Sequence, residues 1–184
     1  MSKRTIYIGM DESNQGELKS KVGEIVVATF SFNKRYWDEH EKHSNRRDYN
    51  QVKSALKKGV DYLYTILPHE LAKENYSNLP LVAPEMLLKI LCFKYSPDIF
   101  IGLDGQISYE DKKRLISKIN EMGFDPSISN YIKKNGVHIG PKLIYLSHLI
   151  ANDLFRNKNL MDLAEDPRYF PFDVFTSDRI KNHL

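Results

Sequence analysis

Two short stretches of the sequence, far apart in the chain, follow the same pattern. Residues 6–11 read IYIGMD and residues 99–104 read IFIGLD, so each is a run of five uncharged residues that ends on an aspartate. Such runs are typical of strands buried on both faces, at the centre of a sheet covered by helices. If the two strands lie side by side and parallel, Asp11 and Asp104 meet at one edge of the sheet. Glu12 follows the first aspartate, and crowded carboxylates favour a bound cation.

The rest of the chain supplies further strands and several helices. We predict strands at residues 4–11, 23–32, 60–67, 99–104 and 127–133, from their β-branched and aromatic content. Apolar residues at helical spacing predict helices at residues 46–58, 83–95, 108–122 and 141–157. Ser108 before the third helix and Gly123 after it are typical capping residues. Residues 35–45 are polar and are predicted to form a loop.

The order of these elements predicts an α/β fold with a mixed five-stranded sheet. The first strand turns directly into the second, which suggests an antiparallel start over the first three strands, whereas the helix before residues 99–104 lets that strand lie parallel to the first. A chain of 184 residues suits one domain. We therefore expect a single domain over residues 1–184, with a core at about 4–157 and a C-terminal extension at 158–184. Asp11, Glu12 and Asp104 then lie beyond the carboxyl ends of parallel strands, where active sites of such sheets form.

An aspartate on the last predicted helix strengthens this prediction. Asp153 lies three residues after Ile150 and four after Leu149, so it continues the apolar face of the helix. A carboxylate buried there must be neutralised, paired or bound to a metal. Alternatives remain open for each residue alone: a strand-end aspartate is often a turn former or a helix cap, Asp153 can pair with a Lys or Arg, and Glu12 can simply be exposed. The conjunction of all four carboxylates favours a metal site.

Charge and hydropathy restrict the possible functions of the chain less strongly than the carboxylate pattern does. The chain has 27 basic and 24 acidic residues and a formal net charge of +3, which permits contact with a polyanion without requiring it. No apolar stretch approaches the roughly 18 residues of a membrane span, and the first residues do not resemble a signal peptide. We therefore expect a cytoplasmic protein without a membrane partner. His138 and His148 are interpreted as packing or surface residues, the commoner role of a lone histidine.

Three motifs together resemble the signature regions of type 2 ribonuclease H. They are residues 9–13 (GMDES), residues 103–105 (LDG) and residues 150–153 (IAND), in the order and setting of that family. The resemblance covers roughly residues 4–157. It implies a ribonuclease H-like three-layer fold with helices on both faces of the sheet. It also implies that Asp11, Glu12, Asp104 and Asp153 bind two divalent cations, Mg²⁺ or Mn²⁺, for phosphodiester hydrolysis by a two-metal mechanism.

The chain departs from the family pattern directly after its first motif. Where the family has a glycine-arginine-glycine loop that addresses the ribonucleotide, this sequence has Asn14, Gln15 and Gly16. These three residues, together with Lys133, Lys134 and Lys142, are the candidate substrate contacts. Three functions follow as alternatives: a nuclease acting on RNA in RNA/DNA hybrids, a related nuclease with another substrate such as structured RNA, and a non-catalytic module that binds nucleic acid or protein.

Overall fold

The computed structural model describes residues 5–13, 24–42, 49–67, 78–90, 98–104, 107–130, 132–134, 137–157 and 160–171. Its main sheet has five strands in the order β4-β2-β1-β5-β6. These strands are β1 (Thr5–Ser13), β2 (Glu24–Ser31), β4 (Val60–Leu67), β5 (Asp98–Leu103) and β6 (Pro126–Asn130). β2 pairs antiparallel with both β1 and β4, whereas β5 runs parallel to β1 and β6 runs parallel to β5. The mixed sheet predicted from the sequence is confirmed.

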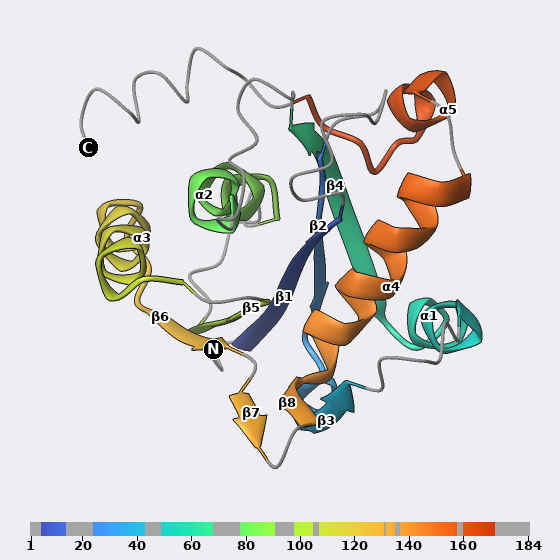
Figure 1. The fold of residues 1–184 in the computed structure, drawn as a ribbon. Helices are drawn as coiled ribbons and strands as arrows, with labels where there is room; N and C mark the ends of the chain where they lie inside the picture. Colours follow the sequence, from blue (N-terminus) through green and yellow to red (C-terminus); the bar gives the residue numbers. More distant parts are fainter. Residues whose placement is uncertain are drawn as a thin grey trace.

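Helices cover both faces of this sheet and give the molecule three layers (Figure 1). On one face lie α2 (Leu79–Ile90) and α3 (Tyr109–Glu121), and on the other lie α1 (Tyr49–Leu56), α4 (Lys142–Asn157) and α5 (Leu160–Glu165). Each face has its own hydrophobic cluster, because successive residues of a strand point to opposite sides. Ile6, Ile8 and Met10 of β1 pack toward α2, while Tyr7 packs on the α4 side.

Two helices show how capping residues set the helix boundaries. Ser108 caps α3 by accepting a hydrogen bond from the Asp111 N–H, and Gly123 follows the helix with a φ of +86°. Helix α2 begins four residues before the predicted start, because the Asn78 carbonyl accepts hydrogen bonds from the N–H groups of Leu81 and Val82. Pro84, predicted near the first turn, therefore lies inside α2. The predicted end of this helix, residues 91–95, lies outside the described residues.

A small second sheet corrects two predictions. It contains β3 (Glu39–Lys42), β8 (Val137–Pro141) and β7 (Ile132–Lys134) in the order β3-β8-β7. The loop predicted at residues 35–45 is wrong, because this segment contains the short 3-10 helix η1 (Lys34–Tyr36) and the strand β3. The single strand predicted at residues 127–133 divides between β6 and β7, which belong to different sheets. β3 has no apolar alternation and forms by pairing with β8, so only the tertiary fold reveals it.

The C-terminal segment lies along the outer edge of the main sheet. The Tyr64 N–H of β4 donates to the Arg168 carbonyl at 3.0 Å, and the Phe170 N–H donates to the Tyr64 carbonyl at 3.1 Å. The Tyr64 hydroxyl also donates to the Leu163 carbonyl at 2.6 Å. Residues 163–170 therefore satisfy backbone groups that an edge strand would otherwise leave exposed. This part of the predicted C-terminal extension is tied to the main sheet.

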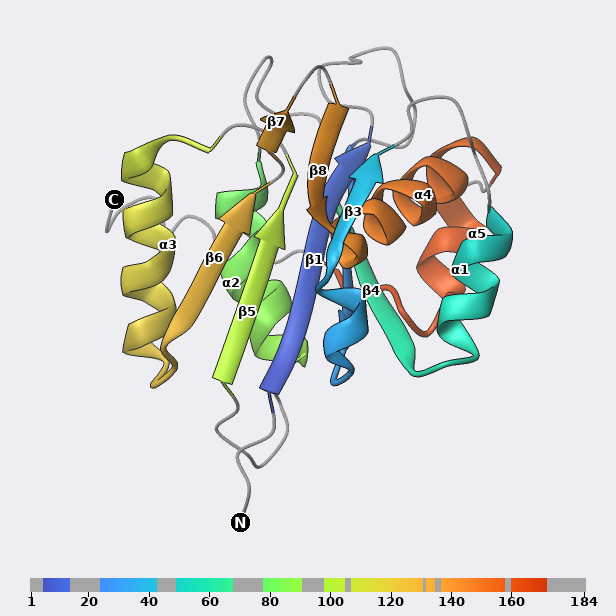
Figure 2. The same ribbon diagram turned by 90° about the horizontal axis from the view of Figure 1, so that it is seen from below.

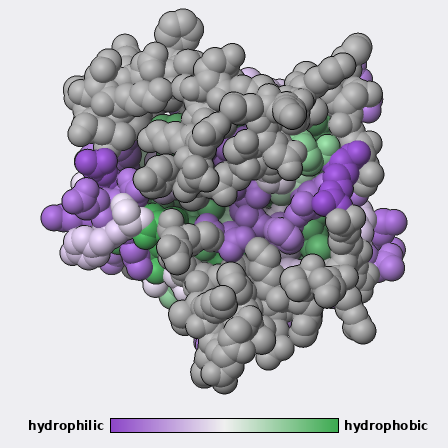
Figure 3. Space-filling view, in the orientation of Figure 1, coloured by the Kyte–Doolittle hydropathy of each residue, from purple (hydrophilic) through white to green (hydrophobic). Residues whose placement is uncertain are grey.

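The surface of the described part gives few signs of a large apolar contact area. Where Figure 3 colours the molecule, hydrophobic residues show as small areas, some of them beside hydrophilic ones. Among the described residues, the exposed large hydrophobic side chains are Phe32, Leu88 and Tyr109, on separate elements. Single exposed apolar residues of this kind are ordinary. None of the helices in the described ranges has the length and apolar composition needed to cross a membrane.

Candidate metal centre

The two strand-end aspartates lie next to each other, as the repeated strand pattern predicts. β1 and β5 are parallel with Met10 opposite Leu103, and the Asp104 N–H donates to the Met10 carbonyl at 3.0 Å. Continuing this register by one residue places Asp11 opposite Asp104. Because side chains alternate along a strand, residues in register on parallel strands share a face. Both carboxylates therefore lie at the carboxyl end of the sheet, on the side covered by α4.

Helix α4 sits directly on β1 because Gly9 has no side chain. A Cβ at Gly9 would lie 2.3 Å from the Leu143 backbone carbon and 2.4 Å from the Ile144 nitrogen, far inside contact distance. The Ser147 hydroxyl donates to the Gly9 carbonyl at 2.8 Å and accepts from the Thr29 N–H at 3.2 Å. One turn later, the Ser13 hydroxyl donates to the Ala151 carbonyl at 3.1 Å. These bonds fix both the position of α4 and its rotation about its own axis.

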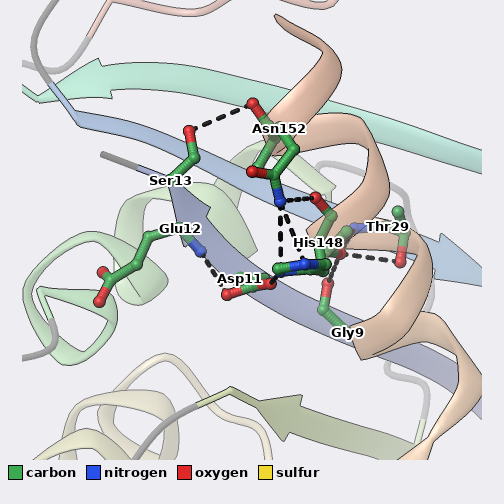
Figure 4. A network of polar contacts seen from close by, with 9 residues as sticks. Gly9, Asp11, Glu12, Ser13, Thr29, His148 and Asn152 are labelled. Carbon is green, nitrogen blue, oxygen red and sulfur yellow. Dashed lines mark hydrogen bonds and ion pairs between the residues drawn. The ribbon is translucent and has the colours of Figure 1, made fainter. Parts of the chain in front are cut away.

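The packing of α4 on β1 places the His148 side chain in contact with Asp11 (Figure 4). His148 Nδ1 lies 2.7 Å from Asp11 Oδ2, and the two side chains are 35% and 5% exposed, respectively. The Glu12 N–H donates to Asp11 Oδ1 at 2.8 Å, so both oxygens of this buried carboxylate accept a hydrogen bond. An ionised carboxylate only accepts, so a proton on Nδ1 suits the short contact with Asp11. His148 thus supplies the polar partner that a carboxylate in this position needs.

Asn152 lies over the imidazole ring of His148. Its side-chain nitrogen is 3.1 Å from Nε2 and 3.4 Å from Nδ1, and it donates to the His148 carbonyl at 2.9 Å. The two ring nitrogens point in different directions, so a nitrogen almost equally close to both lies above the face of the ring, as Figure 4 shows. Asn152 therefore restricts the orientation of the imidazole through an i, i+4 contact on α4.

Asp11, Asp104 and His148 form a group that can hold one divalent cation. One ligand atom from each residue lies within 4.8 Å of the others, and this is the only group of at least three such residues in the described ranges. Ligands on opposite sides of a Mg²⁺ ion lie about 4.2 Å apart, since each bond is about 2.1 Å long. Small side-chain movements therefore fit the three residues to an ion. Two carboxylates with one imidazole suit Mn²⁺, and two carboxylates alone suit Mg²⁺.

Glu12 points to the other side of the sheet, as Figure 4 shows. Its Oε2 accepts a hydrogen bond from the Asn78 N–H at 3.1 Å, and the Asn78 side-chain amide donates to Glu24 Oε2 at 2.9 Å. The pKa of Glu12 is raised to about 9, mainly by burial and then by a hydrogen bond to Glu24 and the charge of Glu24, while the Asn78 N–H acts to lower it. Burial also raises the pKa of Glu24. A proton shared by Glu12 and Glu24 follows from this environment.

Asp153 contacts Tyr49 of α1 and is not a member of the group of Asp11, Asp104 and His148 described above. It forms a hydrogen bond with Tyr49, whose pKa rises to about 12, chiefly because of burial and then because of the Asp153 charge. Leu149 and Ile150, from which the sequence argument placed Asp153, belong to the hydrophobic cluster that α4 shares with Val52 and Ala55 of α1. Asp153 does continue that face, but the face that meets β1 and Asp11 carries Ser147, His148 and Ala151.

His148 is the residue that the sequence analysis did not assign to the site. The small residues on the same side of α4 could have identified it. Ser147 and Ala151 allow the helix to approach β1 closely, and His148, next to Ser147, then lies over the end of the strand. The candidate contacts Asn14, Gln15 and Gly16 lie outside the described residues, and the side chains of Lys133 and Lys134 in β7 are likewise not described. Lys142 is the first residue of α4 and lines a cleft beside α1.

The fold is similar to that of solved ribonucleases. A chain of the PCNA:RNase HII complex from Archaeoglobus fulgidus matches 96% of this chain over 87% of its own length, with a TM-score of 0.54 and 14% identity. The ribonuclease H2 from Pyrococcus horikoshii OT3 matches 97% of this chain over 87% of its length, with a TM-score of 0.47 and 17% identity. No protein-family model and no curated protein sequence matches. The chain has a ribonuclease H-like fold.

Proposed function

We propose that this chain is a divergent member of the type 2 ribonuclease H family. In this proposal it hydrolyses phosphodiester bonds of RNA in RNA/DNA hybrids and depends on Mg²⁺ or Mn²⁺. The observation that carries the proposal is the group formed by Asp11, Asp104 and His148. It lies beyond the carboxyl ends of two adjacent parallel strands, where α/β sheets bind their ligands. The fold, which is shared with a ribonuclease of this kind, supports the same class of substrate.

Each residue of the group has a separate role in the proposal. Asp11 and Asp104 supply oxygen ligands to a divalent cation, which activates water and stabilises charge on the phosphate when it is bound. His148 holds the Asp11 carboxylate through the 2.7 Å contact of its Nδ1, which leaves Nε2 as the ring nitrogen that can bind a metal. Outer contacts that orient ligands in this way typically change metal affinity or activity by about 10–100-fold when they are lost.

A second ion remains part of the proposal as a prediction. In the described residues the nearest further carboxylate on β1 is Glu12, which is directed toward Glu24 and Asn78. Glu12 becomes a good ligand only after it loses its proton, since metals bind the ionised carboxylate. A substrate phosphate can supply the remaining oxygens, because Mg²⁺ is usually held by one or two carboxylates plus substrate phosphates.

The test is a cleavage panel with matched variants. Labelled RNA/DNA hybrid, duplex with a single ribonucleotide, structured RNA and DNA are incubated with the chain in Mg²⁺ or Mn²⁺. We expect cleavage of the hybrid, and a loss of at least about a hundredfold in Asp11→Asn and Asp104→Asn, since each removes a charged ligand. Asp98→Asn is the control, because Asp98 is exposed at the opposite end of the same strand β5.

Different outcomes of this panel point to different functions. Full cleavage by Asp104→Asn contradicts the metal site. Metal-dependent cleavage of structured RNA but not of the hybrid keeps the nuclease and replaces its substrate. Tight binding of nucleic acid without turnover in either metal, together with no binding of Mn²⁺ in calorimetry, replaces the enzyme by a binding module. Circular dichroism of each variant checks that the fold is retained.

A further inference from the structure

A cleft lined by basic residues lies beside the beginning of α4, away from the carboxylates. It has a volume of about 460 Å³, and its lining includes three cationic side chains: Arg35 of η1, Lys58 after α1, and Lys142 of α4. The polar side chains of Asn50, Gln51 and Ser54 complete one wall. Among the described residues that line it, none is acidic. The three cations come from separate segments, so the fold gathers them at one place.

No carboxylate of the described residues is paired with any of these three cations, Arg35, Lys58 and Lys142. Most surface cations gain little from such pairs, but three of them around one cleft repel one another unless an anion is present. The positive charge of the cleft therefore favours the binding of a negatively charged ligand.

Arg35 is held in a fixed orientation at the edge of this cleft. Its Nη2 donates to the Tyr36 hydroxyl at 2.8 Å and to the Lys58 carbonyl at 3.4 Å, and its guanidinium lies 4.7 Å from the centre of the Tyr36 ring. The Nε and Nη1 hydrogens donate to no described residue. A guanidinium whose remaining donors are already oriented matches the oxygens of a phosphate well.

We infer that this cleft binds a backbone phosphate of the nucleic acid at a distance from the bond that is cleaved. The choice of ligand rests on the proposed function. The cleft and Asp11 lie on the same face of the sheet, and α1 and β3 lie beside α4 at this end (Figure 2). Lys142 precedes His148 by six residues, which is about 9 Å along the helix axis. A phosphate bound in the cleft therefore belongs to a different nucleotide from the one at the metal group.

The test measures binding of a fluorescein-labelled RNA/DNA hybrid in EDTA, so that neither cleavage nor metal binding contributes. Lys58→Ala and Lys142→Ala should each weaken binding by about fivefold to tenfold near 0.1 M salt. Each should also reduce the slope of log K against log salt by about one, because one phosphate contact is lost. These lysines are preferred to Arg35, whose bond to the Lys58 carbonyl also supports the end of α1.

Lys57→Ala is the matched control. Lys57 is exposed and adjacent to Lys58 but does not line the cleft, so it changes the net charge equally. We expect the affinity of Lys57→Ala for the hybrid to stay within about twofold of that of the original chain. Its slope of log K against log salt should be unchanged within experimental error. Equal losses in all three variants, or no loss in Lys58→Ala and Lys142→Ala, overturn the inference. Weaker binding in these two variants of a chain that cleaves no substrate supports the cleft and contradicts the proposed nuclease instead.

Discussion

The carboxyl end of β1 carries two adjacent carboxyl groups whose surroundings differ completely. Asp11 faces α4, where the His148 imidazole and the Glu12 N–H both contact its oxygens. Glu12 faces α2, where it meets a second carboxyl, Glu24, and where burial raises its pKa to about 9. Donors around Asp11 stabilise an ionised ligand, whereas the surroundings of Glu12 stabilise a proton. A pair of acidic residues in a motif therefore does not by itself define a pair of metal ligands.

The two sides also differ in how they are built. On the α4 side the contact depends on backbone proximity, since Gly9 and Ser147 let the helix rest on the strand. On the α2 side it depends on one residue, because the Asn78 N–H donates to Glu12 and the Asn78 side-chain amide donates to Glu24. Substitutions can therefore disturb one side and leave the other unchanged, and each of the following predictions uses that independence.

The largest effect is expected for Gly9→Ala. The added Cβ would meet backbone atoms of Leu143 and Ile144, which cannot move without lifting α4 from β1. We expect a loss of about 3 kcal/mol or more in the free energy of unfolding, at the upper end of the usual cost of overpacking. Mn²⁺ binding should also fall, because His148 separates from Asp11. Urea denaturation and calorimetry measure the two effects.

Gly102→Ala is the control for this substitution. Its Cβ would meet the end of the Ile144 side chain at 2.8 Å, and a side-chain tip can move where a backbone cannot. The loss should be about 1 kcal/mol, with Mn²⁺ binding retained. If the two variants lose equal stability and bind Mn²⁺ equally, α4 does not rest on β1 at Gly9.

The contrast between local and tertiary information explains what the sequence could predict. The strand positions follow from the apolar runs and the mixed strand directions from the connections, and Asp11 meets Asp104 because the same pattern ends both strands. β3 could not be predicted, because its residues take their conformation from pairing with β8. The contact between His148 and Asp11 could not be predicted either, since it depends on the rotation of α4 about its axis. That rotation is set by Gly9 and Ser147, not by the apolar periodicity.

A smaller effect is expected in the pH dependence of stability on the Glu12 side. The pKa of Glu12 rises from 4.5 to about 9 on folding, mainly through burial. Below pH 4.5 the group is protonated in both states, and its contribution to stability is fully present. Between these two values the folded state holds the extra proton, so stability falls as pH rises and the contribution is lost through pH 9. The slope for one proton is at most about 1.4 kcal/mol per pH unit.

Glu12→Gln tests this assignment in EDTA. Glutamine does not titrate, so urea denaturation across the same pH range should show a shallower fall in stability than in the original chain. Glu121→Gln, an exposed glutamate at the end of α3, is the control and should leave the slope unchanged. An unchanged slope in Glu12→Gln means that Glu12 and Glu24 do not share a proton in the folded chain.

The smallest effect is expected for Asp153→Asn, and it separates the geometry from the family resemblance. If Asp153 acts only through Tyr49, the substitution should cost about 1 kcal/mol, the usual contribution of one hydrogen bond. Tyr49→Phe should cost a similar amount, and the double variant should cost less than the sum, because the two residues share one interaction. Cleavage and Mn²⁺ binding should stay within about twofold, unlike the loss of at least about a hundredfold expected for Asp104→Asn. A comparable loss of cleavage in Asp153→Asn, with the fold retained and Tyr49→Phe fully active, would instead place Asp153 among the metal ligands, as the resemblance to type 2 ribonuclease H implies.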